Sequence, residues 1–245
     1  MAEFKLPTEV VELPSKGLVY PKDNPLSEGK VEIKYMTAKE EDILTNQSYI
    51  QKGIVLDKLL ESIIVSKINL DDLIIGDKNA VLIAARILGY GSKYTFNYLG
   101  KRETVDLSKL DNKEVDLSNI IEGKNEFSYT LESTGTQIMY KILTGKDEKK
   151  IDKELAGYKK INPDNIPEIS TRLKYMIISI EGDTDRKNIN EFVDNYLLAR
   201  DSRAFRQHVR ETQPDVDLSY TLESEEEVTI PIGMNFFWPD SGQLI

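Results

Sequence analysis

Four arginines recur along one predicted helix and could bind carboxylates of another protein. The segment ARDSRAFRQHVRE (Ala199 to Glu211) places them near i, i+3, i+6 and i+10, at Arg200, Arg203, Arg206 and Arg210. This spacing gathers the guanidinium groups along one side of a helix, while the apolar residues tend toward another side. A guanidinium can make two parallel hydrogen bonds to one carboxylate. The stripe therefore suits docking onto an acidic protein surface.

A second interpretation of the arginine helix needs no partner. The stripe can be a solvated face that Asp201 and Glu211 partly neutralise. Nucleic acid fits the stripe less well, since aromatic residues are not interleaved with the arginines. The net charge of −10 also argues against a general role on nucleic acid, because phosphate binding needs a cationic surface.

Catalytic motifs are not evident in the sequence. The single histidine, His208, has no adjacent Ser, Cys or paired acid, so we expect a surface or partly packed histidine. The glycine-lysine segments 89–93 and 145–147 lack the spacing of a phosphate-binding loop and suit turns and caps. The chain has 42 acidic residues, but no short motif singles out two of them for hydrolysis. We predict that the protein is not an enzyme, with a hydrolase that uses unrecognised carboxylates as the alternative.

Metal binding is not predicted either. Asp183 and Asp185 have the spacing of the first two ligands of a calcium loop, but Lys187 occupies the third ligand position. We interpret Asp185 as the cap of the next helix. The chain has no cysteine, which removes thiolate metal sites and disulfides. The sequence therefore predicts no metal and no cofactor.

The C-terminal tail concentrates aromatic side chains, with Phe236, Phe237 and Trp238 in succession. Aromatic residues bury large areas and often anchor interfaces. They can equally close the protein's own core. Pro231 and Pro239 bracket the segment, which favours a short pinned segment over a free one. We predict the second arrangement and keep the three residues as candidates for partner binding.

Composition points to an ordered globular protein. The chain has 245 residues, of which 40% are hydrophobic and 30% are charged, unlike a disordered tail. Its apolar runs are too short to span a bilayer, and its start does not resemble a secretory signal. We expect a soluble protein without membrane contact. The lack of cysteine is compatible with a reducing cytosol.

The pattern of prolines and apolar residues predicts an α+β fold. Pro7, Pro14, Pro21 and Pro25 indicate an extended arm that cannot lie inside a sheet. A short strand over residues 31–35 follows, and Thr37 with Glu40 has the spacing of a helix capping box. Helical spacing recurs in two clusters, over residues 55–64, 80–88 (after a Gly76-Asp77 turn), 144–158, 169–180, 189–197 and 201–211.

Alternating apolar residues predict strands between and after these helices. Two hairpins are expected over residues 94–107 and 218–232, and two further strands over 127–131 and 138–142. The proline-containing loop 159–168 resembles a linker. We predict an extended arm (residues 1–30), an N-terminal α+β subdomain (31–143), and a C-terminal helical subdomain with a hairpin and the aromatic tail (144–245). The fold is thus two helical clusters with two small antiparallel hairpin sheets.

Three segments of the chain resemble the baseplate hub protein family of T4-like tailed bacteriophages. They are LPSKGLVYPKDNPLSEGKVEIKYMTAKEED (Leu13 to Asp42), DSRAFRQHVRETQPDVDLSYTLES (Asp201 to Ser224) and VTIPIGMNFFWPD (Val228 to Asp240). Relatives in this family sometimes carry Cys-x-x-Cys pairs at the two hairpins, where zinc would clamp them. The corresponding tips here, residues 99–103 and 223–227, offer no sulfur or imidazole.

The resemblance implies a structural or assembly protein of a contractile-phage tail baseplate hub. Such a protein would bind other baseplate or hub proteins without catalysis. It would act in the host cytoplasm during assembly and could end in the tail baseplate of the virion. A tail-assembly chaperone that is absent from the finished virion is the alternative within the same biology. The sequence leaves the oligomeric state open.

Overall fold

The fold combines helices and short strands, as the sequence predicts. The structure, a computed structural model, describes residues 6–222 and 225–237. Within these residues lie the helices α1 (Ala38–Leu44), α2 (Gln47–Gln51), α3 (Val55–Ile63), α4 (Ile75–Tyr90), α5 (Gly145–Ile161), α6 (Glu168–Met176), α7 (Arg186–Asn195) and α8 (Ala199–Thr212). The strands are β1 (Thr8–Glu12), β2 (Lys30–Lys34), β3 (Lys93–Tyr98), β4 (Lys101–Asp106), β5 (Phe127–Thr130), β6 (Gln137–Tyr140), β7 (Ile177–Ile180), β8 (Ser219–Thr221) and β9 (Glu227–Thr229).

The strands form four small antiparallel sheets over the described part of the chain. The two predicted hairpins are present, as β3 paired with β4 and β8 paired with β9. A further pair joins β1 to β2, and β5, β6 and β7 form a three-stranded sheet in that order. In the same residues, no helix is both long enough and apolar enough to cross a lipid bilayer.

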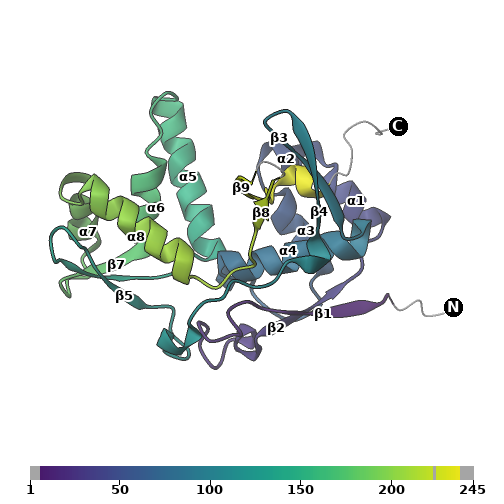
Figure 1. Cartoon of the computed structure of the whole chain (residues 1–245), viewed down its shortest axis with the longest axis horizontal. Coiled ribbons are helices and arrows are strands. Elements are labelled where there is room, and N and C mark those ends of the chain that lie inside the picture. The colour runs from purple at the N-terminus through teal and green to yellow at the C-terminus, as the bar shows by residue number, and fades with distance from the viewer. Residues whose placement is uncertain (1–5, 223–224, 238–245) are drawn as a thin grey trace.

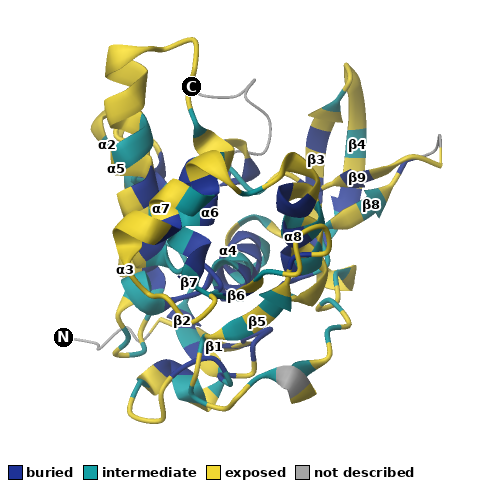
Figure 2. Ribbon diagram, turned by 90° about the vertical axis from the view of Figure 1, so that its left-hand side faces the viewer, coloured by how far each residue is buried: buried dark blue, intermediate teal, exposed yellow. Residues whose placement is uncertain are grey.

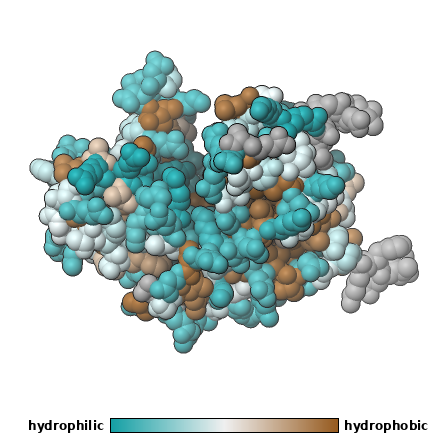
Figure 3. Space-filling model, in the orientation of Figure 1, coloured by the Kyte–Doolittle hydropathy of each residue, from teal (hydrophilic) through white to brown (hydrophobic). Residues whose placement is uncertain are grey.

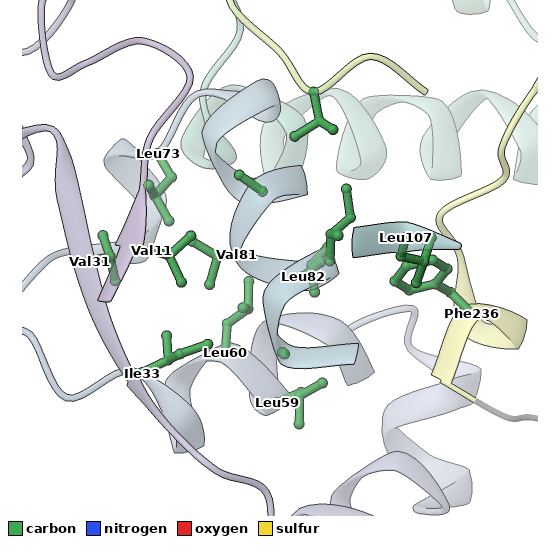
Figure 4. Packing of buried hydrophobic residues seen from close by; sticks show 14 of the residues in the cluster. Val11, Val31, Ile33, Leu59, Leu60, Leu73, Val81, Leu82, Leu107 and Phe236 are labelled. Carbon is green, nitrogen blue, oxygen red and sulfur yellow. The ribbon is translucent and has the colours of Figure 1, made fainter. Parts of the chain in front are cut away.

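Two hydrophobic cores organise these elements, and they lie in different parts of the molecule (Figure 1). The first core is built around α3 and α4 and is lined by β1, β2 and the β3–β4 hairpin. Figure 4 shows Val81 and Leu82 of α4 between the side chains of β1 and β2 and those near Phe236. The second core fills the space between the β5–β6–β7 sheet and the helices α5 to α8.

The C-terminal segment leaves the second core and returns to the first. Val216, Val228, Ile230, Phe236 and Phe237 are all buried in the first core. Conversely, Leu131, Ile138 and Tyr140, in and beside β5 and β6, are buried in the second core. The two cores therefore do not follow the predicted division at residue 143, because residues after it are buried in the first core and residues before it are buried in the second.

Part of the N-terminal arm lies in a sheet, which corrects the prediction that the arm cannot do so. Strand β1 pairs with β2 from Thr8 opposite Lys34 to Glu12 opposite Lys30. Pro7 and Pro14 lie outside this five-residue strand, so neither ring removes a hydrogen bond from the pairing. The loop that follows is also folded, because Leu13, Val19, Tyr20 and Leu26 are buried in the first core.

Helix α4 begins earlier than predicted, because Gly76 and Asp77 belong to its first turn and do not form a separate turn. At Gly76 the backbone of the C-terminal segment passes very close. A Cβ atom on Gly76 would lie 2.0 Å from the carbonyl oxygen of Pro214. Glycine is required here for this contact and not for turn geometry. Gly91 does cap the helix, with a φ of 81° that favours glycine.

The predicted helix 169–180 is two elements. Helix α6 ends at Met176, and the chain continues directly as β7, which pairs with β6 through Ile138 opposite Ile180. Ile177, Ile178 and Ile180 are β-branched, and such residues suit a strand. The apolar positions of residues 177–180 fit both the helical and the strand repeat of side chains. Because these residues form β7, the helical interpretation of 177–180 was wrong.

The loop predicted as a linker joins two packed helices. Helices α5 and α6 contact each other directly and belong to the second core. Arg172 on α6 donates to both carboxylate oxygens of Glu148 on α5, at 2.7 and 3.0 Å. Residues 162–167 therefore connect the arms of a helical hairpin that projects from the molecule (Figure 1).

Glu40 completes the predicted capping box at the start of α1 and is fully buried. Its carboxylate accepts hydrogen bonds from the Thr37 backbone N–H (2.8 Å) and Oγ1 (2.6 Å), from Ser62 Oγ (2.6 Å) and from Lys34 Nζ (3.0 Å). Burial acts to raise the pKa of Glu40, but these hydrogen bonds together lower it to about 2.

We expect this lowered pKa to make folding sensitive to acid. The carboxylate favours the folded state above its ordinary pKa of 4.5, and the contribution is lost as the pH falls from 4.5 toward 2. Glu40→Gln should therefore lower the free energy of unfolding at pH 7 by up to about 3 kcal/mol, with little difference left near pH 2. Urea denaturation at several pH values measures this. Glu41→Gln, at an exposed neighbour, is the control, and an equal loss in both variants would contradict the assignment.

Candidate functional site

Helix α8 presents the predicted arginines on the side away from the protein interior. Its buried face is formed by Ser202, Phe205 and Val209, which pack toward the second core. The arginines lie on the opposite side of the helix. Arg200, Arg203 and Arg210 are exposed, and Arg206 is half-buried, with Nε donating to the Ser202 carbonyl at 3.3 Å. We call these four residues the arginine face.

The arginine face is not neutralised by its own helix. Asp201 is buried, and its Oδ1 accepts a hydrogen bond from the Ser133 backbone N–H at 2.9 Å. Glu211 accepts from Gln207 Nε2 at 2.6 Å. Across the described ranges, none of the four arginines lies within ion-pair distance of a carboxylate. Asp201 and Glu211 therefore make no ion pair with the four arginines, and the interpretation of the stripe as a solvated face now rests on exposure to water alone.

The aromatic residues of the tail that the structure describes are inside the fold. Phe236 and Phe237 are fully buried and meet edge to face, with ring centroids 5.5 Å apart. Phe236 also packs edge to face against Tyr94 at 4.8 Å. Both residues thus close the first core and are not available as a surface, as the folded-back interpretation predicts. Trp238 lies outside the described residues.

His208 is partly packed, as predicted. Its Nε2 lies 3.1 Å from the Tyr140 hydroxyl, and its ring stands 4.6 Å from the ring of Tyr129. Partial burial lowers the pKa of His208, which favours the neutral imidazole. Its contacts are those of a residue that joins α8 to the β5–β6 strands.

The loop with Asp183 and Asp185, whose spacing resembles that of a calcium loop, is stabilised by hydrogen bonds among its own polar groups. Asp185 caps α7 by accepting from the Lys187 backbone N–H at 2.7 Å, as predicted. Asp183 accepts from the Asp185 N–H at 2.8 Å and from Asn188 Nδ2 at 2.7 Å. Within residues 6–222 and 225–237, no three His, Asp or Glu side chains converge as metal ligands would.

A buried polar cluster around Asp77 is the main feature that sequence reasoning missed. Asp77 accepts from the Ser15 N–H (3.0 Å) and Oγ (2.6 Å) and from the Tyr20 hydroxyl (2.6 Å). Asp215 lies nearby and accepts from Asn79 Nδ2 at 3.1 Å. Burial raises the pKa of both carboxyls, and hydrogen bonding offsets part of the effect. The cluster joins the N-terminal loop, α4 and the returning C-terminal segment.

Raised carboxyl pKa values can mark an active site, but this cluster lacks the access that a substrate needs. Both aspartates are buried, and neither lines either of two surface cavities of the described chain. One cavity, of about 440 Å³, is lined by side chains such as Ser128, Gln137 and Ser179. The other, of about 290 Å³, includes Asp183 and Glu191. The hydrogen bonds from Asp185 and Asn188 lower the pKa of Asp183, which is the wrong direction for a general acid.

A second exposed feature lies at the free end of the α5–α6 hairpin. Tyr158, Ile161, Ile166 and Ile169 are all exposed there, and Ile161 is 86% exposed. Figure 2 shows the outer turns of α5 as exposed, and Figure 3 shows hydrophobic surface near this end of the hairpin. We call these four residues the apolar tip.

Comparison with known proteins finds no matching family model, no matching curated protein and no matching solved structure. The arginine face and the apolar tip are two exposed surfaces on the part of the molecule built around the second core. Both are suited to contact with protein, one by charge and the other by apolar area.

Proposed function

We propose that this chain is a structural or assembly protein of a contractile-phage tail baseplate hub. It would act by binding other hub proteins, without catalysis and without a cofactor. The proposal is supported by the resemblance of three separated segments to that family. The α+β fold provides rigid supports for docking surfaces, since both described surfaces lie on helices packed against one core.

The observation that carries the proposal is the unpaired arginine face. Four guanidinium groups on one helix side have no carboxylate partner in the described chain, although the protein carries a net charge of −10. An acidic protein surface would supply the missing carboxylates, and bidentate pairing would give it a fixed orientation. The apolar tip adds a second contact of a kind that marks protein interaction sites.

We expect Arg203→Glu combined with Arg206→Glu to abolish co-purification with hub proteins from infected cells. The free energy of unfolding should change by no more than about 1 kcal/mol, because Arg203 is exposed and the half-buried Arg206 makes one long hydrogen bond, to the Ser202 carbonyl. Lys39→Glu combined with Lys52→Glu is the matched control, since it makes the same change in net charge at two exposed positions outside α8. Undiminished association of the arginine variant would count against the proposal.

Mass spectrometry of purified virions and of infected-cell lysate separates two forms of the proposal. Recovery from both samples supports a hub component that stays in the baseplate. Recovery from lysate alone supports an assembly chaperone that is released before the virion is complete. Either form requires the arginine face to bind a hub protein, so the charge-reversal variant tests both.

A further inference from the structure

The smaller cavity lies between the end of β7 and helix α7. It has a volume of about 290 Å³. Ile180, Ile189 and Phe192 provide apolar lining, while Asp183 and Glu191 are exposed carboxylates at its edge. Tyr196 also lines the cavity, with 61% of its surface exposed. The cavity therefore combines apolar walls, aromatic rings and negative charge.

This combination fits a cationic side chain with an aliphatic stem. The methylene groups of arginine or lysine can pack on apolar walls while the charged end stays near carboxylates. A tyrosine or phenylalanine ring adds attraction to the cation. The Asp185 N–H and Asn188 Nδ2 donate hydrogen bonds to Asp183, which favours its ionised carboxylate form. The volume is at the lower limit of small-molecule sites, so a single side chain suits it better than a cofactor.

The same corner of the molecule carries the complementary cations. The arginine face begins at Arg200, four residues beyond Tyr196 of the cavity. Between them stands Leu198, which is exposed. An apolar centre with charged groups around it is the usual anatomy of a protein interface. Under a twofold axis, two neighbouring patches of opposite charge on one chain become self-complementary.

We propose that two copies of this chain pair through the corner formed by α7 and α8. An arginine of the arginine face of each copy would occupy the cavity beside α7 of the other copy. Tyr196 and Leu198 of both copies would meet near the twofold axis. This inference goes beyond the baseplate proposal, because it concerns contacts between copies of this chain.

Sedimentation velocity of the full chain over a wide range of concentrations tests the pairing. We expect a monomer–dimer equilibrium that weakens as salt is added, because the contact depends on charge. Glu191→Arg should weaken dimerisation about tenfold or more, and so should Arg203→Glu combined with Arg206→Glu. The Lys39→Glu, Lys52→Glu variant should dimerise like the parent.

Mixing the two charge-reversed variants gives the decisive measurement. In a mixed pair, one contact joins the unchanged arginine face of the Glu191→Arg variant to the unchanged cavity of the Arg203→Glu, Arg206→Glu variant. The other contact joins the face made acidic by Arg203→Glu and Arg206→Glu to the cavity made basic by Glu191→Arg. Both contacts are then complementary, so the mixture should form the dimer that each variant alone forms poorly. A parent chain that stays monomeric, or variants that stay apart when mixed, would overturn the inference.

The same samples keep this inference separate from the baseplate proposal. If the parent chain is monomeric while the arginine variant loses hub proteins, self-pairing is wrong and the baseplate proposal stands. If the parent pairs as expected while the arginine variant keeps its hub proteins, self-pairing stands and the docking role toward hub proteins is wrong.

Discussion

Replacing Phe236 with alanine is expected to lower the free energy of unfolding by about 3–5 kcal/mol. The ring is fully buried in the first core, where it contacts Tyr94 and Phe237 edge to face. Figure 4 shows it beside Leu107, at the boundary between the returning C-terminal segment and the rest of that core. Removing the ring leaves a cavity that the surrounding backbone cannot fill. Urea denaturation followed by circular dichroism measures the loss.

Ile161→Ala is the control for the Phe236 variant. This side chain belongs to the apolar tip and is 86% exposed, so its removal should change stability by less than about 0.5 kcal/mol. The comparison separates the two roles that aromatic and apolar residues could have in this chain. If Phe236→Ala unfolds at the same urea concentration as the parent, the C-terminal segment does not close the first core.

Local patterns in the sequence predicted many of the elements. Thr37 and Glu40 form the capping box that their spacing indicates, and Asp185 caps α7. The hairpins β3–β4 and β8–β9 follow the alternation of apolar residues. Prediction failed where one pattern fits two structures, as at Ile177 to Ile180, whose apolar positions suit both a helix and a strand. Only the pairing of β7 with β6, far away in the chain, decides between them.

Local patterns predicted part of the candidate site, but not the polar contacts between distant segments. Helical spacing correctly placed the four arginines on one side of α8. The same spacing places Asp201 one turn before Phe205, on the buried side, so the sequence did contain the signal that this carboxylate turns inward. The contact between Ser15 and Asp77, which spans 62 residues, has no such local signal. Long-range polar contacts depend on how whole elements pack.

Arg86 provides the clearest case of a long-range contact with a large expected effect. The side chain is fully buried on α4. Its Nε donates to the Phe236 carbonyl at 2.9 Å, Nη1 to the Gly91 carbonyl at 2.8 Å and Nη2 to the Lys93 carbonyl at 3.2 Å. The guanidinium also lies over the rings of Tyr90 and Tyr94. One side chain thus joins the end of α4, the start of β3 and the C-terminal segment.

We expect Arg86→Met to lower the free energy of unfolding by about 2–4 kcal/mol. Methionine matches the length of the aliphatic stem but leaves three carbonyl oxygens without their donor, of which the Phe236 oxygen is buried and the Gly91 and Lys93 oxygens are part-buried. An unsatisfied buried acceptor costs about 1–3 kcal/mol, and a part-buried one costs less because water can reach it. Burial of the charge works in the opposite direction, since it lowers the pKa of Arg86 and makes the guanidinium costly to bury. Three lost hydrogen bonds and the lost ring contacts should outweigh that gain.

Arg203→Met is the matched control for Arg86→Met, because it removes an exposed arginine and should change stability by less than about 0.5 kcal/mol. Combining Arg86→Met with Phe236→Ala tests whether the two residues act together. Since Arg86 binds the Phe236 carbonyl, loss of either should loosen the same segment, and the double variant should lose less than the sum of the single losses. Full additivity would mean that Arg86 and Phe236 act independently. An Arg86→Met variant as stable as the parent would mean that aromatic packing alone holds the C-terminal segment in the first core.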